Sequence, residues 1–106
     1  MTEPLDSIIQ AIRGEAYRFS VSHYWKQVVE DPPRPLPTAV IASIGNNDPE
    51  IVEDYPRDVR GASCLILGVN GYGNQIHSVI GYKYDPIRII TAYYPNDRFI
   101  DGRIRR

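Results

Sequence analysis

Residues Gln75 to Tyr94 read QIHSVIGYKYDPIRIITAYY and have the clearest strand pattern in the chain. β-Branched and aromatic residues dominate both halves of this stretch, and Asp85-Pro86 separates them, which is typical of two strands joined by a turn. The sequence therefore predicts strands over Gln75–Tyr84 and Ile87–Tyr94. Because the connection is short, we expect the two strands to pair antiparallel.

Two further strands are predicted upstream, over Glu50–Tyr55 and Ala62–Val69. Turn signals follow each of them, at residues 56–58 and 70–74. The second half of the chain should therefore be an antiparallel meander. Three glycines around the second turn lack the spacing of a nucleotide-binding loop and are interpreted as part of a hairpin turn. They are Gly68, Gly71 and Gly73.

The first half of the chain has helical patterns. Leu5, Ile8 and Ile12 recur at helical spacing between Pro4 and Gly14, which predicts an amphipathic helix over residues 4–13. After a short strand or extended segment at Tyr17–Val21, Ser22 is expected to cap a second helix over residues 23–30.

A loop with four prolines in seven residues, Asp31–Pro37, precedes a short apolar helix at Thr38–Ile44. Together these elements predict an α+β domain in which N-terminal helices pack on one face of a mostly antiparallel sheet of about four strands. With 106 residues, of which 42% are hydrophobic, we expect residues 1–106 to be a single domain.

Composition also restricts the class of protein. Wholly apolar runs are about four residues long, far short of the roughly 20 that a membrane helix needs, so no membrane association is expected. The acidic start lacks the apolar segment of a secretory signal, which favours the cytoplasm. The single cysteine, Cys64, permits no internal disulfide or Cys-x-x-Cys metal site. We expect no cofactor, and we interpret Cys64 as a buried small apolar residue.

Charge is divided unevenly along the chain. Up to Asp54 there are four basic and nine acidic residues, whereas the remainder has eight basic and four acidic residues. A basic second half suits phosphate binding, although a solvated surface with a basic tail explains the same count. The candidate RNA-binding residues are Arg60, Lys83, Arg88, Arg103 and Arg105.

The hairpin brings a histidine and a tyrosine together. If Tyr84 lies opposite Ile87, Lys83 pairs with Arg88 and His77 with Tyr94. A shift of one residue places Tyr93 opposite His77 instead. An imidazole transfers protons near neutral pH, and a phenol or guanidinium can hold a phosphate oxygen as charge develops. These are the groups of a metal-independent ribonuclease, in which the RNA 2′-hydroxyl is the nucleophile.

Structural interpretations of the same residues stay open. A single strand histidine is often only a hydrogen-bonded core residue, and His23 is either a second acid/base group or part of a turn. The adjacent Tyr24 and Trp25 are interpreted as core or partner-facing aromatic residues. No ligand spacing supports a metal site made of His23, His77 and Cys64.

Read end to end, the chain resembles the domain-of-unknown-function 4258 family of small bacterial proteins, which are often encoded beside zinc-finger antitoxins. The order and spacing of several segments carry this resemblance. They are Ile12-Arg13, residues 17–20 before His23, residues 50–56, residues 60–68, Ile76-His77, residues 89–96 and the ending Arg105-Arg106.

That family looks related to the RelE-like and BrnT-like toxins, which are compact α+β proteins that cleave messenger RNA and are silenced by an antitoxin protein. The resemblance implies a RelE-like fold and a toxin endoribonuclease acting on free or ribosome-bound RNA. Its two histidines fall on His23 and His77, and its Thr-x-Tyr signature falls on Thr91 and Tyr93. The implied catalytic residues are therefore His77, His23 and Tyr93. The alternative is a non-catalytic protein-interaction module, or a diverged toxin fold.

Overall fold

The computed structural model describes residues 3–45, 48–59, 61–95, 99–100 and 103–105. The first half of the chain contains helices and one short strand, and strands alone follow. The elements are α1 (Glu3–Arg13), β1 (Tyr17–Phe19), η1 (Val21–Trp25), α2 (Lys26–Glu30), α3 (Pro37–Gly45), β2 (Glu50–Tyr55), β3 (Ser63–Val69), β4 (Gln75–Gly81), β5 (Ile87–Tyr93), β6 (Phe99–Ile100) and β7 (Ile104–Arg105).

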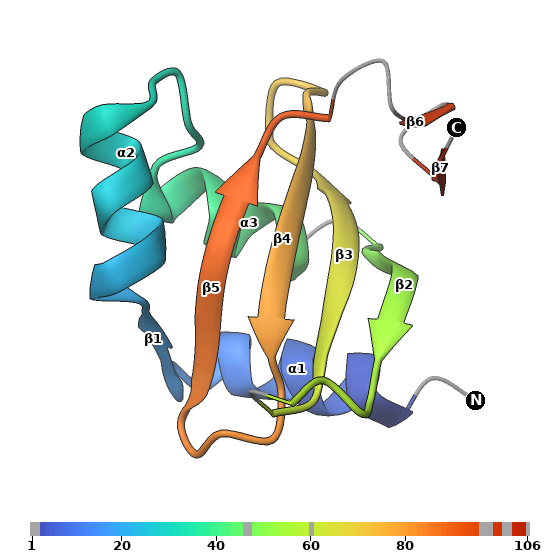
Figure 1. Cartoon of the computed structure of the whole chain (residues 1–106). Helices are drawn as coiled ribbons and strands as arrows, with labels where there is room; N and C mark the ends of the chain where they lie inside the picture. The colour runs from blue at the N-terminus through green and yellow to red at the C-terminus, as the bar shows by residue number, and fades with distance from the viewer. Residues whose placement is uncertain (1–2, 46–47, 60, 96–98, 101–102, 106) are drawn as a thin grey trace.

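The main sheet has five strands in the order β1-β5-β4-β3-β2 (Figure 1). The predicted meander from β2 to β5 is confirmed, because each successive pair in it is antiparallel. The fifth strand, β1, joins the edge of the sheet parallel to β5, so the sheet is mixed. The expected four-stranded sheet with all helices ahead of it is therefore too simple, since β1 precedes η1, α2 and α3.

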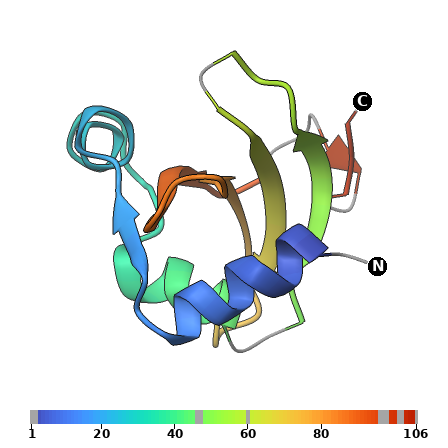
Figure 2. The same cartoon turned by 90° about the horizontal axis from the view of Figure 1, so that it is seen from below.

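Helices α1 and α3 cover one face of the sheet, which we call the helix-covered face (Figure 2). The predicted amphipathic helix near the N-terminus is confirmed: it is α1, and Leu5, Ile8 and Ile12 on its apolar face are all buried. They pack in one core with sheet residues that include Cys64, which is fully buried as expected. Burial raises the pKa of the Cys64 thiol to about 12, with a smaller contribution from Asp54, so the thiol stays protonated and unreactive at neutral pH.

Gly68 lies within β3, so interpreting it as part of a hairpin turn was wrong; the turn itself is at residues 70–74. A Cβ atom on Gly68 would be only 2.2 Å from the carbonyl oxygen of Ser43 in α3. Glycine is therefore required at this position because it lets the backbone of the helix approach the backbone of the strand.

The second predicted helix begins earlier than expected, and its first turn is wide. Residues Val21–Trp25 form a π-helical turn, η1, that continues directly into α2. The cap is Ser20 rather than Ser22, because the Ser20 hydroxyl accepts a hydrogen bond from the backbone N–H of His23 (3.2 Å). The helix is thus anchored directly after β1, where the chain leaves the sheet.

Tyr24 anchors this helix to the core. Its side chain is 1% exposed, and its hydroxyl donates a hydrogen bond to the carbonyl oxygen of Pro35 (2.7 Å). Trp25, the next residue, is half-exposed on the outer side of the helix. Burial, with a smaller contribution from Tyr94, raises the pKa of Tyr24 to about 12.

Replacing Tyr24 by phenylalanine is expected to lower the free energy of unfolding at pH 7 by about 1–3 kcal/mol, because the buried carbonyl of Pro35 loses its donor. Wild-type stability should also fall between pH 10 and about 12, since the unfolded chain releases the tyrosine proton there and the folded chain keeps it. Urea unfolding measured at pH 7, 10 and 11.5 checks both effects.

The Tyr24→Phe variant should lose less stability than the wild type over that alkaline range. Tyr72→Phe is the matched control, because Tyr72 is 92% exposed and should change neither value. An equal alkaline loss in the wild type and in Tyr24→Phe would contradict the assignment.

Along the part of the chain that the structure describes, no helix combines the length and the apolar character needed to cross a membrane.

Candidate functional site

The face of the sheet opposite α1 and α3 is seen from the front in Figure 1. We call it the front face. Strand register defines three rows, because aligned residues on neighbouring strands point to the same side. The first contains Glu50, Leu67, His77 and Tyr93; the second contains Glu53, Leu65, Val79 and Thr91; the third contains Tyr55, Ser63, Gly81, Arg88 and Arg18.

Two predicted site residues meet in the first row. His77 is the register partner of Tyr93, and the two rings pack edge to face with their centroids 5.3 Å apart. The register that paired His77 with Tyr94 is therefore wrong, and the register shifted by one residue is correct. His77 is 0% exposed and Tyr93 is half-buried, so both side chains are packed against neighbouring residues on the front face rather than open to solvent.

The third row has two arginines side by side. Arg18 of β1 and Arg88 of β5 are register partners in the parallel strand pair, so their side chains leave the same face of the sheet. Both are exposed. Lys83, by contrast, lies in the turn after β4 and is not opposite Arg88, whose partner is Gly81. The predicted pairing of Lys83 with Arg88 is therefore wrong.

Tyr84 explains why β4 ends at Gly81 and how Arg88 is held. A Cβ atom on Gly81 would be 2.7 Å from the Tyr84 ring, so only glycine lets this ring fold back over the strand. The Arg88 guanidinium lies over the same ring, 4.2 Å from its centroid. Such cation–π contact restricts the arginine side chain at little cost to its positive charge.

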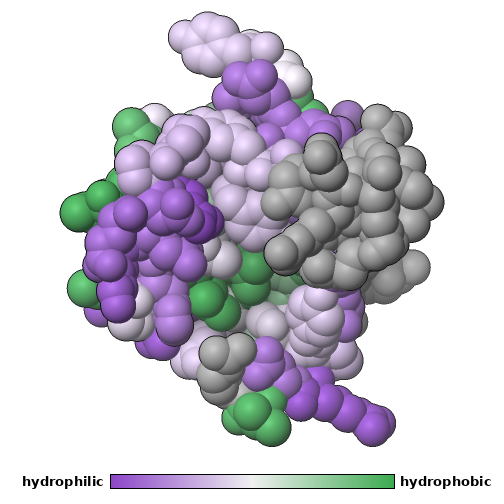
Figure 3. Space-filling view, turned by 45° about the horizontal axis from the view of Figure 1, so that its top comes forward, coloured by the Kyte–Doolittle hydropathy of each residue, from purple (hydrophilic) through white to green (hydrophobic). Residues whose placement is uncertain are grey.

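A cavity of about 170 Å³ opens beside Arg88. The helix η1–α2 rises on one side of the front face and the loop between β2 and β3 on the other (Figure 2), and both contribute to it. Figure 3 shows a hollow in this face with hydrophobic atoms at its floor and more hydrophilic atoms around it. The residues that line the cavity are Ser20, Ser22, His23, Asp58, Gly61, Ser63, Val79, Tyr84, Arg88 and Ile90.

His23 is the histidine that borders this cavity. It is exposed, and it lies in the π-helical turn η1, whose cap bond to Ser20 fixes its backbone. π-Helical turns are rare in proteins, and those that do occur are often found at functional sites. The wider turn changes the direction in which a side chain points. His23 and Arg88 thus line the same cavity.

The two histidines lie at different ends of the front face. His77 and Gly81 are four residues apart on β4, which corresponds to about 13 Å along a strand. Gly81 is aligned with Arg88, so the His77–Tyr93 pair is distant from the cavity that contains His23 and Arg88. The structure thus separates residues that the sequence analysis grouped together.

The remaining predicted RNA-binding residues are dispersed. The Arg103 side chain forms an ion pair with Glu50 at the far edge strand (Nε–Oε1 2.5 Å), and the Lys83 ammonium lies 5.9 Å from the Tyr82 ring centroid. Arg60 lies outside the described residues, and for Arg105 only the backbone in β7 is described. Among the predicted arginines whose side chains the structure describes, Arg88 lines the cavity and Arg103 does not.

The sequence did not predict a role for Tyr84, which lines the cavity, or for Arg18, the register partner of Arg88. Arg18 was not a candidate because its pairing with β5 is a parallel contact between strands far apart in sequence. Tyr84 was interpreted only as a strand residue, although a tyrosine three residues after a glycine and four before an arginine was a weak signal for the stacked arrangement.

Fold and site together define a small α+β protein with a polar cavity, bordered by Arg88, His23 and Asp58, on the face of its sheet opposite α1 and α3. The sequence profile of a domain of unknown function, DUF4258, matches residues 13–94, and the chain belongs to this family. Neither the curated proteins nor the solved structures contain a match to the chain.

Proposed function

We propose that this protein is a metal-independent endoribonuclease, the toxin of a bacterial toxin–antitoxin pair. One observation carries the proposal: Arg88 and an exposed histidine, His23, line the same cavity, and Arg18 is the register partner of Arg88. Guanidinium groups suit phosphate oxygens in charge and shape, and histidine is the side chain best suited to proton transfer near pH 7.

In the proposed reaction, neutral His23 accepts the proton of the RNA 2′-hydroxyl, and the 2′-oxygen attacks the adjacent phosphorus. The bond from phosphorus to the 5′-oxygen breaks, and solvent supplies the proton that the leaving oxygen requires. Arg88 and Arg18 stabilise the charge that builds on the phosphate oxygens. Tyr84 acts as a positioning residue through its contact with Arg88.

His77 and Tyr93 have a different role in this proposal. Because His77 is fully buried, we assign it to holding Tyr93 in place at the far end of the front face, where a longer RNA strand would pass.

The test is incubation of the purified protein with labelled single-stranded RNA in a metal chelator, with and without ribosomes. We expect fragments that end in 2′,3′-cyclic phosphate and 5′-hydroxyl groups. An oligonucleotide with 2′-deoxyribose at the cleaved position is the matched control and should stay intact, because it lacks the nucleophile. Intact RNA under both conditions would overturn the proposal.

A protein partner is supported by a separate observation. Val21, Trp25 and Val29 recur every four residues along η1–α2, and they form an exposed apolar stripe on its outer side, with Leu36 nearby in sequence. Exposed apolar residues at helical spacing are typical of a surface that receives another helix. We propose that an amphipathic helix of the antitoxin packs on this stripe.

Trp25 reports on this contact because it is the single tryptophan of the chain. Adding the protein encoded beside this one, with its own tryptophans replaced by phenylalanine, should shift Trp25 emission to shorter wavelength as the ring leaves water. Val29→Asp should weaken binding, whereas Val59→Asp, at a 99% exposed residue elsewhere, should not. A complex seen by gel filtration without the emission shift would place the partner on another surface.

A further inference from the structure

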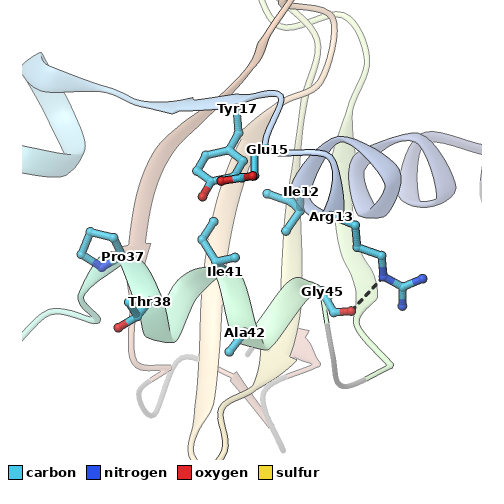
Figure 4. A pocket seen from close by; sticks show the side chains of 9 residues that line it. All are labelled: Ile12, Arg13, Glu15, Tyr17, Pro37, Thr38, Ile41, Ala42 and Gly45. Atoms are coloured by element: carbon cyan, nitrogen blue, oxygen red, sulfur yellow. Dashed lines mark hydrogen bonds between the residues drawn. The ribbon is translucent and has the colours of Figure 1, made fainter.

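A second hollow lies away from the front face, between the end of α1, strand β1 and helix α3 (Figure 4). Its volume is about 540 Å³, within the usual range for small-molecule sites. Ile12, Ile41 and Ala42 give it apolar walls, and a few polar groups border it. The residues that line it are Ile12, Arg13, Glu15, Tyr17, Pro37, Thr38, Ile41, Ala42 and Gly45.

Glu15 occupies this groove at a conformational cost. It follows the last turn of α1 with a φ of 60°, the left-handed conformation that normally belongs to glycine. The backbone N–H of Glu15 bonds to the carbonyl of Ile12 (3.2 Å) and that of Ala16 to the carbonyl of Ala11 (2.8 Å), the usual helix-ending arrangement. Non-glycine residues kept in strained positions often have a functional side chain.

The electrostatics of the groove favour a positive charge. Helix α1 ends beside it, and the C-terminal end of a helix attracts cations, whereas α3 borders the groove with both of its ends, so its dipole adds no net preference. The Arg13 side chain already meets one of these ends, because its Nε–H donates to the carbonyl oxygen of Gly45 (3.0 Å). Within the described part of the chain, no cation lies within ion-pair distance of the Glu15 carboxylate.

Tyr17 adds a second group that binds cations. Figure 4 shows the side chains of Glu15 and Tyr17 projecting into the groove toward Ile41 of α3, whereas the Arg13 guanidinium points outward. An aromatic face beside a carboxylate suits an ammonium or guanidinium group, and the apolar wall suits an attached hydrocarbon arm.

We propose that this groove is a binding site for a small organic cation, an amine or guanidine that carries an apolar arm. The arm lies against Ile12 and Ile41, and the charged group lies between Glu15 and the Tyr17 ring. This site is independent of the ribonuclease activity proposed above.

The test is an NMR titration of the folded protein with phenethylammonium, and with 2-phenylethanol as a neutral probe of similar shape. The amide signals of Glu15, Tyr17 and Ile41 should shift with the cation, and the neutral probe should bind at least about fivefold more weakly. Glu15→Gln should weaken the cation by a similar factor. Glu30→Gln is the control, because Glu30 is exposed on α2, away from the groove.

A second variant separates binding from folding. Glu15→Gly should raise the melting temperature by about 4 °C, since glycine suits the left-handed position, while cation binding falls as in Glu15→Gln. Equal affinity for both probes would overturn the proposal. The proposal would also be overturned if Arg13→Gln abolished binding and Glu15→Gln did not, because the site would then bind an anion. A lysine-containing peptide that binds where the free amine does not would overturn the small-molecule assignment.

Discussion

Replacing His23 by alanine is expected to slow RNA cleavage by about 10²–10⁴-fold while leaving the fold intact. The rate should fall because the cavity loses the side chain that accepts the 2′-hydroxyl proton. The fold should persist because His23 is exposed and its backbone hydrogen bond to Ser20 does not depend on the side chain. Cleavage rates at saturating RNA, together with melting curves, measure both effects.

Two control variants make this result specific. Lys26→Ala removes an exposed cation from the same helix but not from the cavity, so it should cleave RNA at nearly the parental rate. His77→Ala removes a fully buried ring, so it should lower stability by about 1–3 kcal/mol through the lost packing on Tyr93, with little change in rate per folded molecule.

The reverse pattern would contradict the assignment. If folded His77→Ala is inactive and His23→Ala cleaves normally, the reaction takes place at the His77–Tyr93 end of the front face. Arg88→Lys adds a further distinction, because lysine keeps the charge but not the planar two-point contact with phosphate. It should lose most of the activity if Arg88 holds the reacting phosphate.

The predictable part of this fold is the part that depends on nearby residues. The spacing of Leu5, Ile8 and Ile12 decides which face of α1 is buried, and the run Glu50–Tyr55 forms a strand with the bounds predicted for it. Each depends on residue types within a few positions along the chain, where hydrophobic periodicity is informative.

The parallel pairing of β1 with β5 was not predictable in the same way. It joins Tyr17 to Ile87, seventy residues apart, and a three-residue strand has too little pattern to specify its neighbour. The candidate site depends on this contact, because it brings Arg18 beside Arg88. The number of basic residues in each half of the chain drew attention to Arg88 but not to Arg18. Such a count does not say which residues are aligned between β1 and β5.

The position of the second histidine was ambiguous for a related reason. A bulge in β5, between the partners of Val79 and Ile80, shifts the hairpin register by one residue. Near the turn Gly81 faces Arg88, a register that would bring Ala92 opposite His77, and the bulge brings Tyr93 there instead. Lys83 lies in the turn because β4 ends at Gly81 and β5 begins at Ile87. No single residue near the bulge specifies it, and Tyr84 becomes important only when it folds over Gly81.

The close approach of α3 to the sheet gives the largest expected effect on stability. Replacing Gly68 by alanine should lower the free energy of unfolding by about 2–5 kcal/mol, a large share of the 5–15 kcal/mol typical of a domain. The added Cβ would stand 2.2 Å from the Ser43 carbonyl oxygen and 2.7 Å from its carbonyl carbon. Both atoms belong to the backbone, so no side-chain rotation relieves the overlap.

Relief therefore requires α3 to move away from β3. That movement would loosen Val40 and Ile44, which are fully buried against the sheet, and it adds the loss of their packing to the strain. Gly71→Ala is the matched control, because nothing lies within 4 Å of a Cβ there and the change should be within about 0.5 kcal/mol. Urea unfolding of both variants measures the difference. Equal stability of Gly68→Ala and the parent would mean that α3 does not lie against β3 at this distance.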